Sequence, residues 1–275
     1  MRLPLVVLVL ASLPRLVVAQ GVLVAPHAIY MDHRTRSGSI TLYNPGNDPV
    51  EVSLSTMFGY PITDSAGDFQ LRTVEDPDST LPSAAKWIQA FPRRMTLGPL
   101  ERQTVRLLGK PPAGLADGEY WARLVVSAKG GAVPVSGVAD TGSIQVGLTL
   151  EVRTILPMLY RKGKVTTGLT MTGLHAGVEH DSLAIRAHLT REGSAAFVGT
   201  VAGALIDSAG HAVSRFKVPS AVYLETDPRF TMPVAGLASG PYRLRLEITS
   251  AREDLPSDVI LPMPPVRDSV EVRLP

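Results

Sequence analysis

Residues 39–54 read Ser-Ile-Thr-Leu-Tyr-Asn-Pro-Gly-Asn-Asp-Pro-Val-Glu-Val-Ser-Leu. Polar and apolar residues alternate in Ser39–Tyr43 and again in Val50–Leu54, which is the pattern of a strand with one buried face. Between these runs, Asn44-Pro45-Gly46-Asn47 supplies the residue types that favour a turn. The stretch therefore predicts a strand, a turn and a second strand.

The same pattern continues on both sides of this stretch. Further candidate strands are Val22–Tyr30, Trp87–Phe91, Gln103–Leu108, Glu119–Ser127 and Ser143–Val152. About seven short strands separated by Gly, Pro, Asp and Ser predict an antiparallel β-sandwich. The segment Pro61–Ala85 is long for a strand connection, so we expect an excursion or an additional hairpin there.

The second half of the chain repeats this style with a different sequence. Its candidate strands are Thr166–Leu174, Leu183–Thr190, Val198–Ile206, Ala212–Val218, Phe230–Val234, Tyr242–Thr249 and Ser269–Leu274. Proline interrupts an apolar run at Leu156-Pro157, which we take as the boundary between two domains of ordinary size. We predict an all-β protein with two tandem immunoglobulin-like β-sandwich domains, at residues 20–155 and 156–275.

The first residues have the features of a secretory signal peptide. Arg2 precedes an apolar run from Leu3 to Leu13, and small residues precede the expected cleavage site after Ala19. The run is too short to span a bilayer. A retained N-terminal anchor is the alternative, because Arg15 is unusual so near a cleavage site. We expect residues 1–19 to be removed and the mature protein to be periplasmic or secreted.

Composition excludes several classes of protein. The chain has no cysteine, so it has no disulfide framework, thiol nucleophile or thiolate zinc site. It has 27 basic and 25 acidic side chains, and removal of Arg2 and Arg15 lowers the formal net charge from +2 to 0. We therefore expect neither a nucleic-acid-binding surface nor a polybasic membrane anchor.

The most regular alternation lies in Ser143–Val152, which reads Ser-Ile-Gln-Val-Gly-Leu-Thr-Leu-Glu-Val. Its apolar side chains would share one face of a strand. They are Ile144, Val146, Leu148, Leu150 and Val152. Two interpretations are open. The segment is an ordinary core strand at the end of the first domain, or it is an edge strand that binds a strand of another protein.

Several short motifs follow one another in a particular order. They are Ala25–Tyr30, Ser39–Asn44, Phe91-Pro92, Met95–Pro99, Gln103–Leu107, Glu119–Leu124 and Met158–Arg161. Together, over residues 22–161, they resemble the N-terminal domain of the periplasmic pilus-assembly chaperones, the PapD-like superfamily. The resemblance implies an immunoglobulin-like sandwich that binds pilus or fimbrial subunits by strand addition and has no enzymatic activity.

The resemblance also implies a site for the client's C-terminal carboxylate. In that family, an arginine of the first strand and a lysine of the donor strand bind this group. The first position falls on His27, and the second on Ile155, or on Arg153 if two residues are inserted before Met158. The implied partners are exported subunits and an outer-membrane usher, and no cofactor or small-molecule substrate is implied.

No catalytic motif is complete. Asp140-Thr141-Gly142 resembles the aspartic-protease segment, but no second copy is present. Ser83 and Lys86 have a serine–lysine spacing without the motifs that accompany it in enzymes. A group of potential metal ligands lacks the spacing of a helical zinc motif: His175, Glu179, His180, Asp181 and His188. We predict neither an enzyme nor a metal site.

Three aromatic residues, Trp87, Tyr120 and Trp121, lie in candidate strands. We predict that they pack in the core and at sheet faces rather than form a sugar-stacking surface.

Two functions are consistent with these observations. The first is a chaperone-like protein that binds exported subunits by β-strand addition through Ile144, Val146, Leu148 and Leu150. The alternative is a structural or adhesive secreted protein of two β-sandwiches. A free edge on the Ser143–Val152 strand favours the first function, whereas a strand paired on both edges favours the second.

Overall fold

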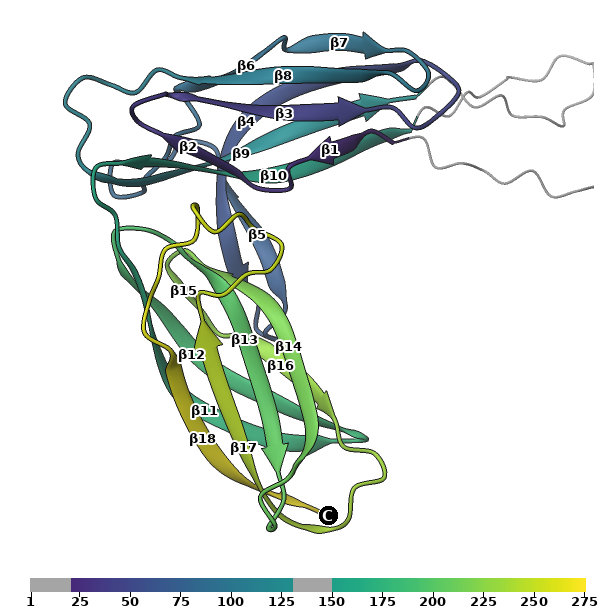
Figure 1. Ribbon diagram of the computed structural model, residues 1–275, viewed down its shortest axis with the longest axis vertical. Coiled ribbons are helices and arrows are strands. Elements are labelled where there is room, and N and C mark those ends of the chain that lie inside the picture. Colours follow the sequence, from purple (N-terminus) through teal and green to yellow (C-terminus); the bar gives the residue numbers. More distant parts are fainter. Residues whose placement is uncertain (1–20, 131–149) are drawn as a thin grey trace, which may run out of the picture.

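The computed structural model describes residues 21–130 and 150–275 of the chain. Within these ranges all regular structure is β-strand, and nothing in them forms a helix that could cross a membrane. Strands β1 to β10 build a first sandwich and β11 to β18 build a second, and the first lies across one end of the second (Figure 1). The predicted all-β architecture of two tandem sandwiches is confirmed.

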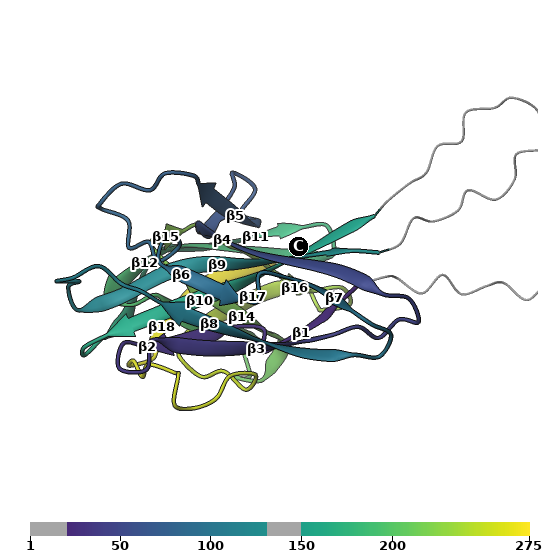
Figure 2. The same ribbon diagram turned by 90° about the horizontal axis from the view of Figure 1, so that it is seen from above.

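The first sandwich has two facing sheets, seen from above in Figure 2. One has the strand order β1-β3-β8-β6, and the other has the order β2-β10-β9-β4-β5, with β7 also paired to β4. The strands are β1 (Leu23–Ala25), β2 (Ile29–Asp32), β3 (Ser37–Tyr43), β4 (Val50–Thr63), β5 (Phe69–Val74), β6 (Ile88–Phe91), β7 (Arg94–Leu97), β8 (Arg102–Gly109), β9 (Gly118–Lys129) and β10 (Glu151–Lys162).

Apolar residues at every second position of β3 and β8 form the centre of this core. Ile40 lies opposite Val105 in the register of the two strands, and both side chains are buried together with Leu42 and Leu107. The predicted turn after β3 is held by Asn44, whose side-chain amide donates to the Asp48 oxygen within the turn and to the Leu97 and Gly98 oxygens across the sandwich. The turn joins opposite sheets and not neighbouring strands, because β3 and β4 belong to different layers.

The prediction of one strand over Val22–Tyr30 is wrong. β1 pairs with β3 in one sheet, whereas β2 pairs with β10 in the other. Pro26 lies in the break between them, where its lack of an N–H group removes no ladder bond. The chain therefore crosses from one layer to the other at this point.

β10 runs without a break from Glu151 to Lys162 and pairs with β9 along its whole length. The division expected between residues 155 and 156 thus falls inside a strand of the first sandwich, which ends at Lys162. Proline is tolerated where its missing N–H faces an unpaired edge, and β2 pairs with β10 only from Met158 onward. Pro157 accordingly marks a change in pairing and not a domain boundary.

The second sandwich consists of two facing sheets. One has the order β11-β12-β15, with β16 also paired to β12, and the other has the order β14-β13-β17-β18. Buried apolar side chains from both sheets, such as Leu189, Val201 and Leu244, form its core. The strands are β11 (Thr167–Glu179), β12 (Ser182–Gly193), β13 (Phe197–Ile206), β14 (Ala212–Val222), β15 (Glu225–Thr226), β16 (Arg229–Pro233), β17 (Gly240–Thr249) and β18 (Val266–Leu274).

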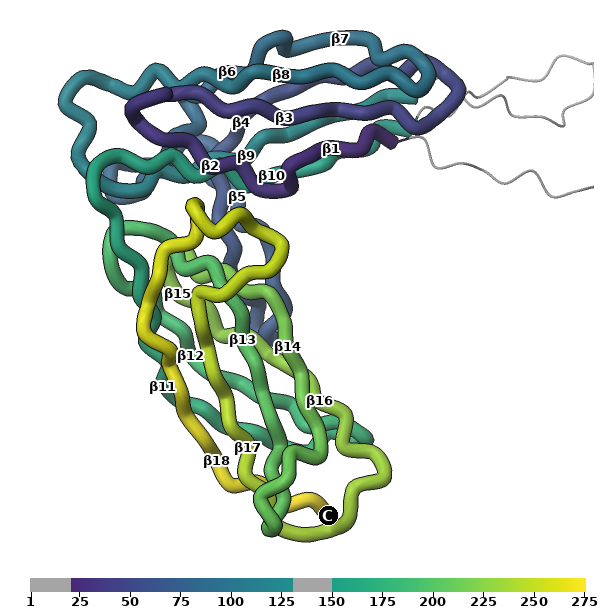
Figure 3. Tube along the Cα trace, in the orientation of Figure 1, coloured from purple at the N-terminus to yellow at the C-terminus, as the bar shows by residue number. Residues whose placement is uncertain are grey.

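The hairpin of β4 and β5 leaves the first sandwich and lies beside the second (Figure 3). At its tip, the Gly67 oxygen accepts a hydrogen bond from the Arg229 N–H at 3.0 Å. The Thr63 hydroxyl oxygen accepts one from the Asp227 N–H at 2.7 Å. The additional hairpin expected in Pro61–Ala85 is therefore present, and it contacts the second domain.

The prediction for the aromatic residues is confirmed. Trp121 is fully buried. Trp87 packs edge-on against Tyr160, with ring centroids 4.7 Å apart, and also contacts Tyr120. These rings fill the core and the space between the sandwiches, so they do not offer an open stacking surface.

Candidate partner-binding edge and cleft

β10 is an edge strand over more than half of its length. One side pairs with β9 throughout, but the other pairs with β2 only at Met158–Arg161, in parallel orientation. β1, which precedes β2, is paired with the opposite sheet. In the described part of the chain, residues Glu151–Pro157 therefore have no partner strand on this side. Unpaired N–H and C=O groups of this kind can accept a further strand.

The side chains of β10 alternate between two environments. Leu156 and Met158 point into the first sandwich and belong to its core. Ile155 and Pro157 point the other way and line a cleft against the second sandwich. A strand added beside Glu151–Pro157 would therefore have an apolar core on one face and this cleft on the other.

Leu150, just before β10, is on the same side of the alternation as Leu156. It is 56% exposed. Leu150 thus continues the row of core-facing side chains but is exposed to water. This is expected at the edge of a sandwich that lacks a covering strand. The other predicted contact residues, Ile144, Val146 and Leu148, lie outside the described residues.

The two predicted carboxylate contacts each bind a different carboxylate of this chain. His27 Nε2 lies 3.0 Å from Asp254 Oδ2, which belongs to the segment between β17 and β18. Arg153 Nε donates to Glu151 Oε1 at 2.7 Å, within β10. The structure does not join His27 and Arg153 in one site. Ile155, the alternative position, is an apolar residue of the cleft wall.

Asp254 is a strong partner for His27. Arg252 donates to both of its carboxylate oxygens, at 2.7 and 2.6 Å. These hydrogen bonds hold the pKa of Asp254 well below its usual range, although burial opposes the shift. The carboxylate is therefore ionised at neutral pH and is already the partner of the His27 ring in this structure.

The cleft has a volume of about 360 Å³ and lies between the hairpin, β10 and the second sandwich. Its wall contains exposed apolar side chains, including Phe69 at 46% and Ile155 at 43% exposure. Arg123 lies at its base, where Nε donates to the Gly59 oxygen at 2.9 Å and the guanidinium lies 5.1 Å from the Tyr223 ring centroid. The wall of the cleft beside the free edge is therefore largely apolar.

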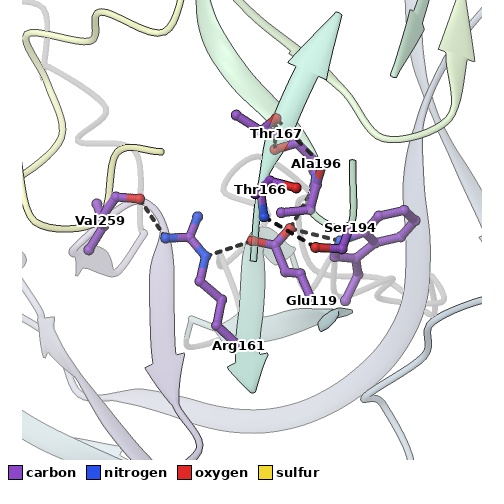
Figure 4. Close-up of polar contacts among 9 residues, drawn as sticks. Glu119, Arg161, Thr166, Thr167, Ser194, Ala196 and Val259 are labelled. Atoms are coloured by element: carbon purple, nitrogen blue, oxygen red, sulfur yellow. Dashed lines mark hydrogen bonds and ion pairs between the residues drawn. The ribbon is translucent and has the colours of Figure 1, made fainter. Parts of the chain in front are cut away.

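Glu119 links the two sandwiches through a buried hydrogen-bond network (Figure 4). Its Oε1 accepts from Trp121 Nε1 at 3.0 Å and from the Ala196 N–H at 2.9 Å. Its Oε2 accepts from Arg161 Nε at 2.7 Å, and Arg161 Nη1 donates to the Val259 oxygen at 2.6 Å. Both sandwiches thus supply partners to one ion pair, whose carboxylate is completely buried.

Sequence reasoning named Glu119 and Arg161 only as members of motifs and missed their pairing. The two residues lie directly opposite each other in the antiparallel register of β9 and β10. That register was the missing information. The sequence does contain one signal for the pair: a glutamate and an arginine each flank a strongly apolar strand.

Two of the remaining candidate residues, His188 and His175, have partners within the second sandwich. His188 Nδ1 is 2.8 Å from Asp227 Oδ1, and His175 Nδ1 is 2.8 Å from the Gly173 oxygen. Across residues 21–130 and 150–275, no three His, Cys, Asp or Glu side chains are grouped so as to hold a metal ion. Asp140-Thr141-Gly142 lies outside these ranges.

Comparison with known proteins gives matches of structure only. No protein-family profile matches the sequence, and no curated protein does. Among solved structures, the YadV chaperone is 16% identical, with a TM-score of 0.46 over 92% of this chain and 99% of that one. A chain of the Salmonella enterica SafA pilin complex with the SafB chaperone is 12% identical, with a TM-score of 0.43 over 91% and 97%. The Pseudomonas aeruginosa CupB2 chaperone is 13% identical, with a TM-score of 0.40 over 92% and 100%.

Proposed function

We propose that this protein is a periplasmic chaperone-like protein that binds an extended segment of another exported protein by adding it as a strand to β10. The unpaired edge at Glu151–Pro157 carries this proposal. The same edge argues against a purely structural module, in which this strand would be paired on both sides. The ordered motifs of residues 22–161 supply the proposed client class, which is pilus or fimbrial-type subunits, and suggest an usher as a further partner.

Main-chain pairing and apolar burial would provide the binding energy. Each added hydrogen bond contributes about 0.5–1.5 kcal/mol net, and each fully buried aliphatic side chain contributes about 1.5–3 kcal/mol. We assign the apolar row to Ile144, Val146, Leu148 and Leu150. Of these, Leu150 is exposed and continues the core side of β10.

Charge contributes less in this proposal than in the family that the motifs resemble. A client carboxylate would have to displace Glu151 from Arg153 and Asp254 from His27. Displacement of either acid exchanges one ion pair for another at an exposed position, which yields little free energy. We therefore assign His27 and Arg153 a secondary role in client contact.

Site-specific crosslinking tests the location of the client. A benzophenone side chain introduced at Leu150 should crosslink to an exported subunit encoded beside this protein and co-expressed with it in the periplasm. The matched control is the same side chain at Leu100, which is exposed to a similar degree but follows β7, which β9 and β4 separate from β10 in the sheet. Equal crosslinking at the two positions would contradict strand addition at β10.

Two further measurements separate binding from folding. The double variant Val146→Asp/Leu148→Asp should lose co-purification of the subunit while its circular dichroism spectrum stays unchanged. Amides of Glu151–Leu156 that point away from β9 should exchange quickly with solvent in the free protein and slowly in the complex. Slow exchange in the free protein would support the structural alternative instead.

A further inference from the structure

The second sandwich has a hollow on the outer face of its β14-β13-β17-β18 sheet, the front sheet in Figure 1. The hollow has a volume of about 970 Å³. Its floor lies along β13, where the outward side chains are small at Ala202 and Ala204. Longer, charged side chains from β14, β17 and β18 form its walls. The result is a trough that follows one strand.

Two arginines face each other across the floor of this trough. Arg215 of β14 and Arg245 of β17 both lie opposite Ala204 in the registers of their strands with β13. Two strand spacings separate them, which is about 10 Å between main chains. Arginine side chains are long enough to bring their guanidinium groups over Ala204 from both sides, because the alanine leaves this space open.

The other cations around the trough already have carboxylate partners. These pairs are Arg243 with Glu271, Arg267 with Glu247 and Lys217 with Glu253. Arg215 and Arg245 form no ion pair with any of the residues that the structure describes, and both are exposed. The row formed by Arg215, Ala204, Arg245 and Ser269 contains no acid at all. The whole lining contains four cations, Arg215, Lys217, Arg245 and Arg267, and two acids, Glu247 and Asp268. A local excess of positive charge therefore remains on a chain whose mature formal charge we expect to be zero.

We propose that Arg215 and Arg245 bind carboxylates of an acidic, extended segment of a partner protein that lies along β13. A guanidinium group matches the two oxygens of a carboxylate in geometry as well as in charge. The small apolar floor fits the main chain and apolar side chains of such a segment, whereas its acidic side chains reach the arginines. This surface lies on the second sandwich and does not depend on strand addition at β10.

Peptide binding tests the proposal directly. A fluorescein-labelled peptide of alternating glutamate and valine should bind the intact protein in a salt-sensitive manner, as measured by fluorescence anisotropy. The variant Arg215→Gln/Arg245→Gln should bind about tenfold more weakly. The control Arg106→Gln/Lys110→Gln removes the same charge from exposed positions of the first sandwich and should bind like the unmodified protein.

Filling the trough provides a second, independent test. In Ala204→Glu, the new carboxylate would occupy the space between the two arginines, so peptide binding should be lost and the melting temperature should exceed that of Ala204→Gln. Three outcomes would overturn the proposal. They are equal binding of the glutamine–valine peptide, unchanged binding by Arg215→Gln/Arg245→Gln, and binding of phosphatidylglycerol vesicles without binding of the acidic peptide.

Discussion

Tyr223 shows how contact between the sandwiches changes the chemistry of one side chain. It is buried, and its ring packs edge-on against Trp121 with centroids 4.7 Å apart. Burial raises the pKa of its hydroxyl from 10.0 to about 12, and the nearby Arg123 only partly offsets this effect. The folded protein thus favours the neutral phenol, because a phenolate would lose its hydration.

This shift predicts a particular loss of stability in alkali. The folded-state pKa of Tyr223 lies above the unfolded value. The contribution of the neutral phenol to the unfolding free energy is therefore complete below pH 10 and is lost as the pH rises through about 12. Between these values, the unfolding free energy of the unmodified protein should fall by about 2 kcal/mol more than that of Tyr223→Phe. Urea denaturation of both proteins across this range measures the difference. Parallel pH profiles would contradict it.

At the scale of elements, the chain contains the same turn sequence twice, in different surroundings. Asp64-Ser65-Ala66-Gly67 closes the hairpin of β4 and β5, and Asp207-Ser208-Ala209-Gly210 closes the hairpin of β13 and β14. The two glycines have nearly identical φ angles of 88° and 89°. Gly67 packs against Arg229 of the second sandwich, whereas no atom lies within 4 Å of the position of a Cβ at Gly210.

This repeat provides a matched pair of variants. Gly67→Ala and Gly210→Ala both place a side chain in the left-handed region, which costs about 1–2 kcal/mol. Only Gly67→Ala also brings a Cβ to 2.6 Å from the Arg229 Cβ, which must move the hairpin away from the second sandwich. We expect Gly67→Ala to lose about 1–2 kcal/mol more in chemical denaturation. Equal losses in the two variants would show that the hairpin contact contributes nothing.

Alternation in the sequence was sufficient to predict elements such as β3 and β8, because each has one buried face and one exposed face. It did not predict where the chain changes sheets, at Pro26, or that β10 continues through Pro157. Those features depend on which strands pair, and pairing is decided by residues far apart in the sequence. The candidate edge is partly predictable for the same reason. Alternation indicates Leu150, but only the short pairing of β2 with β10 shows that the rest of this edge has no partner among the described residues.

At the scale of the whole molecule, the Glu119–Arg161 pair and the apolar cluster beside it connect the sandwiches. The cluster contains Trp121 and Leu159 from the first sandwich and Tyr223 from the second. Glu119 contributes both a main-chain and a side-chain bond to the second sandwich, to Ser194 and Ala196. We therefore expect the two sandwiches to unfold together.

Neutralising this glutamate should separate the two unfolding events. In Glu119→Gln, the partly buried Arg161 loses its counter-ion, which costs up to about 3–5 kcal/mol. Differential scanning calorimetry should show one transition in the unmodified protein and two in the variant. Asp76→Asn, which breaks the exposed pair with Lys86, is the control and should keep a single transition at almost the same temperature. A single, unshifted transition in Glu119→Gln would contradict this coupling.

The partial pairing of β2 with β10 has a consequence for any segment added at the same edge. β2 occupies positions Met158–Arg161, so an added strand must stop at Pro157. Bound segments of different lengths would therefore be aligned at this common end, and their differences would extend beyond Glu151. β2 would therefore fix the register of every bound segment at one end by steric exclusion, without any charged contact.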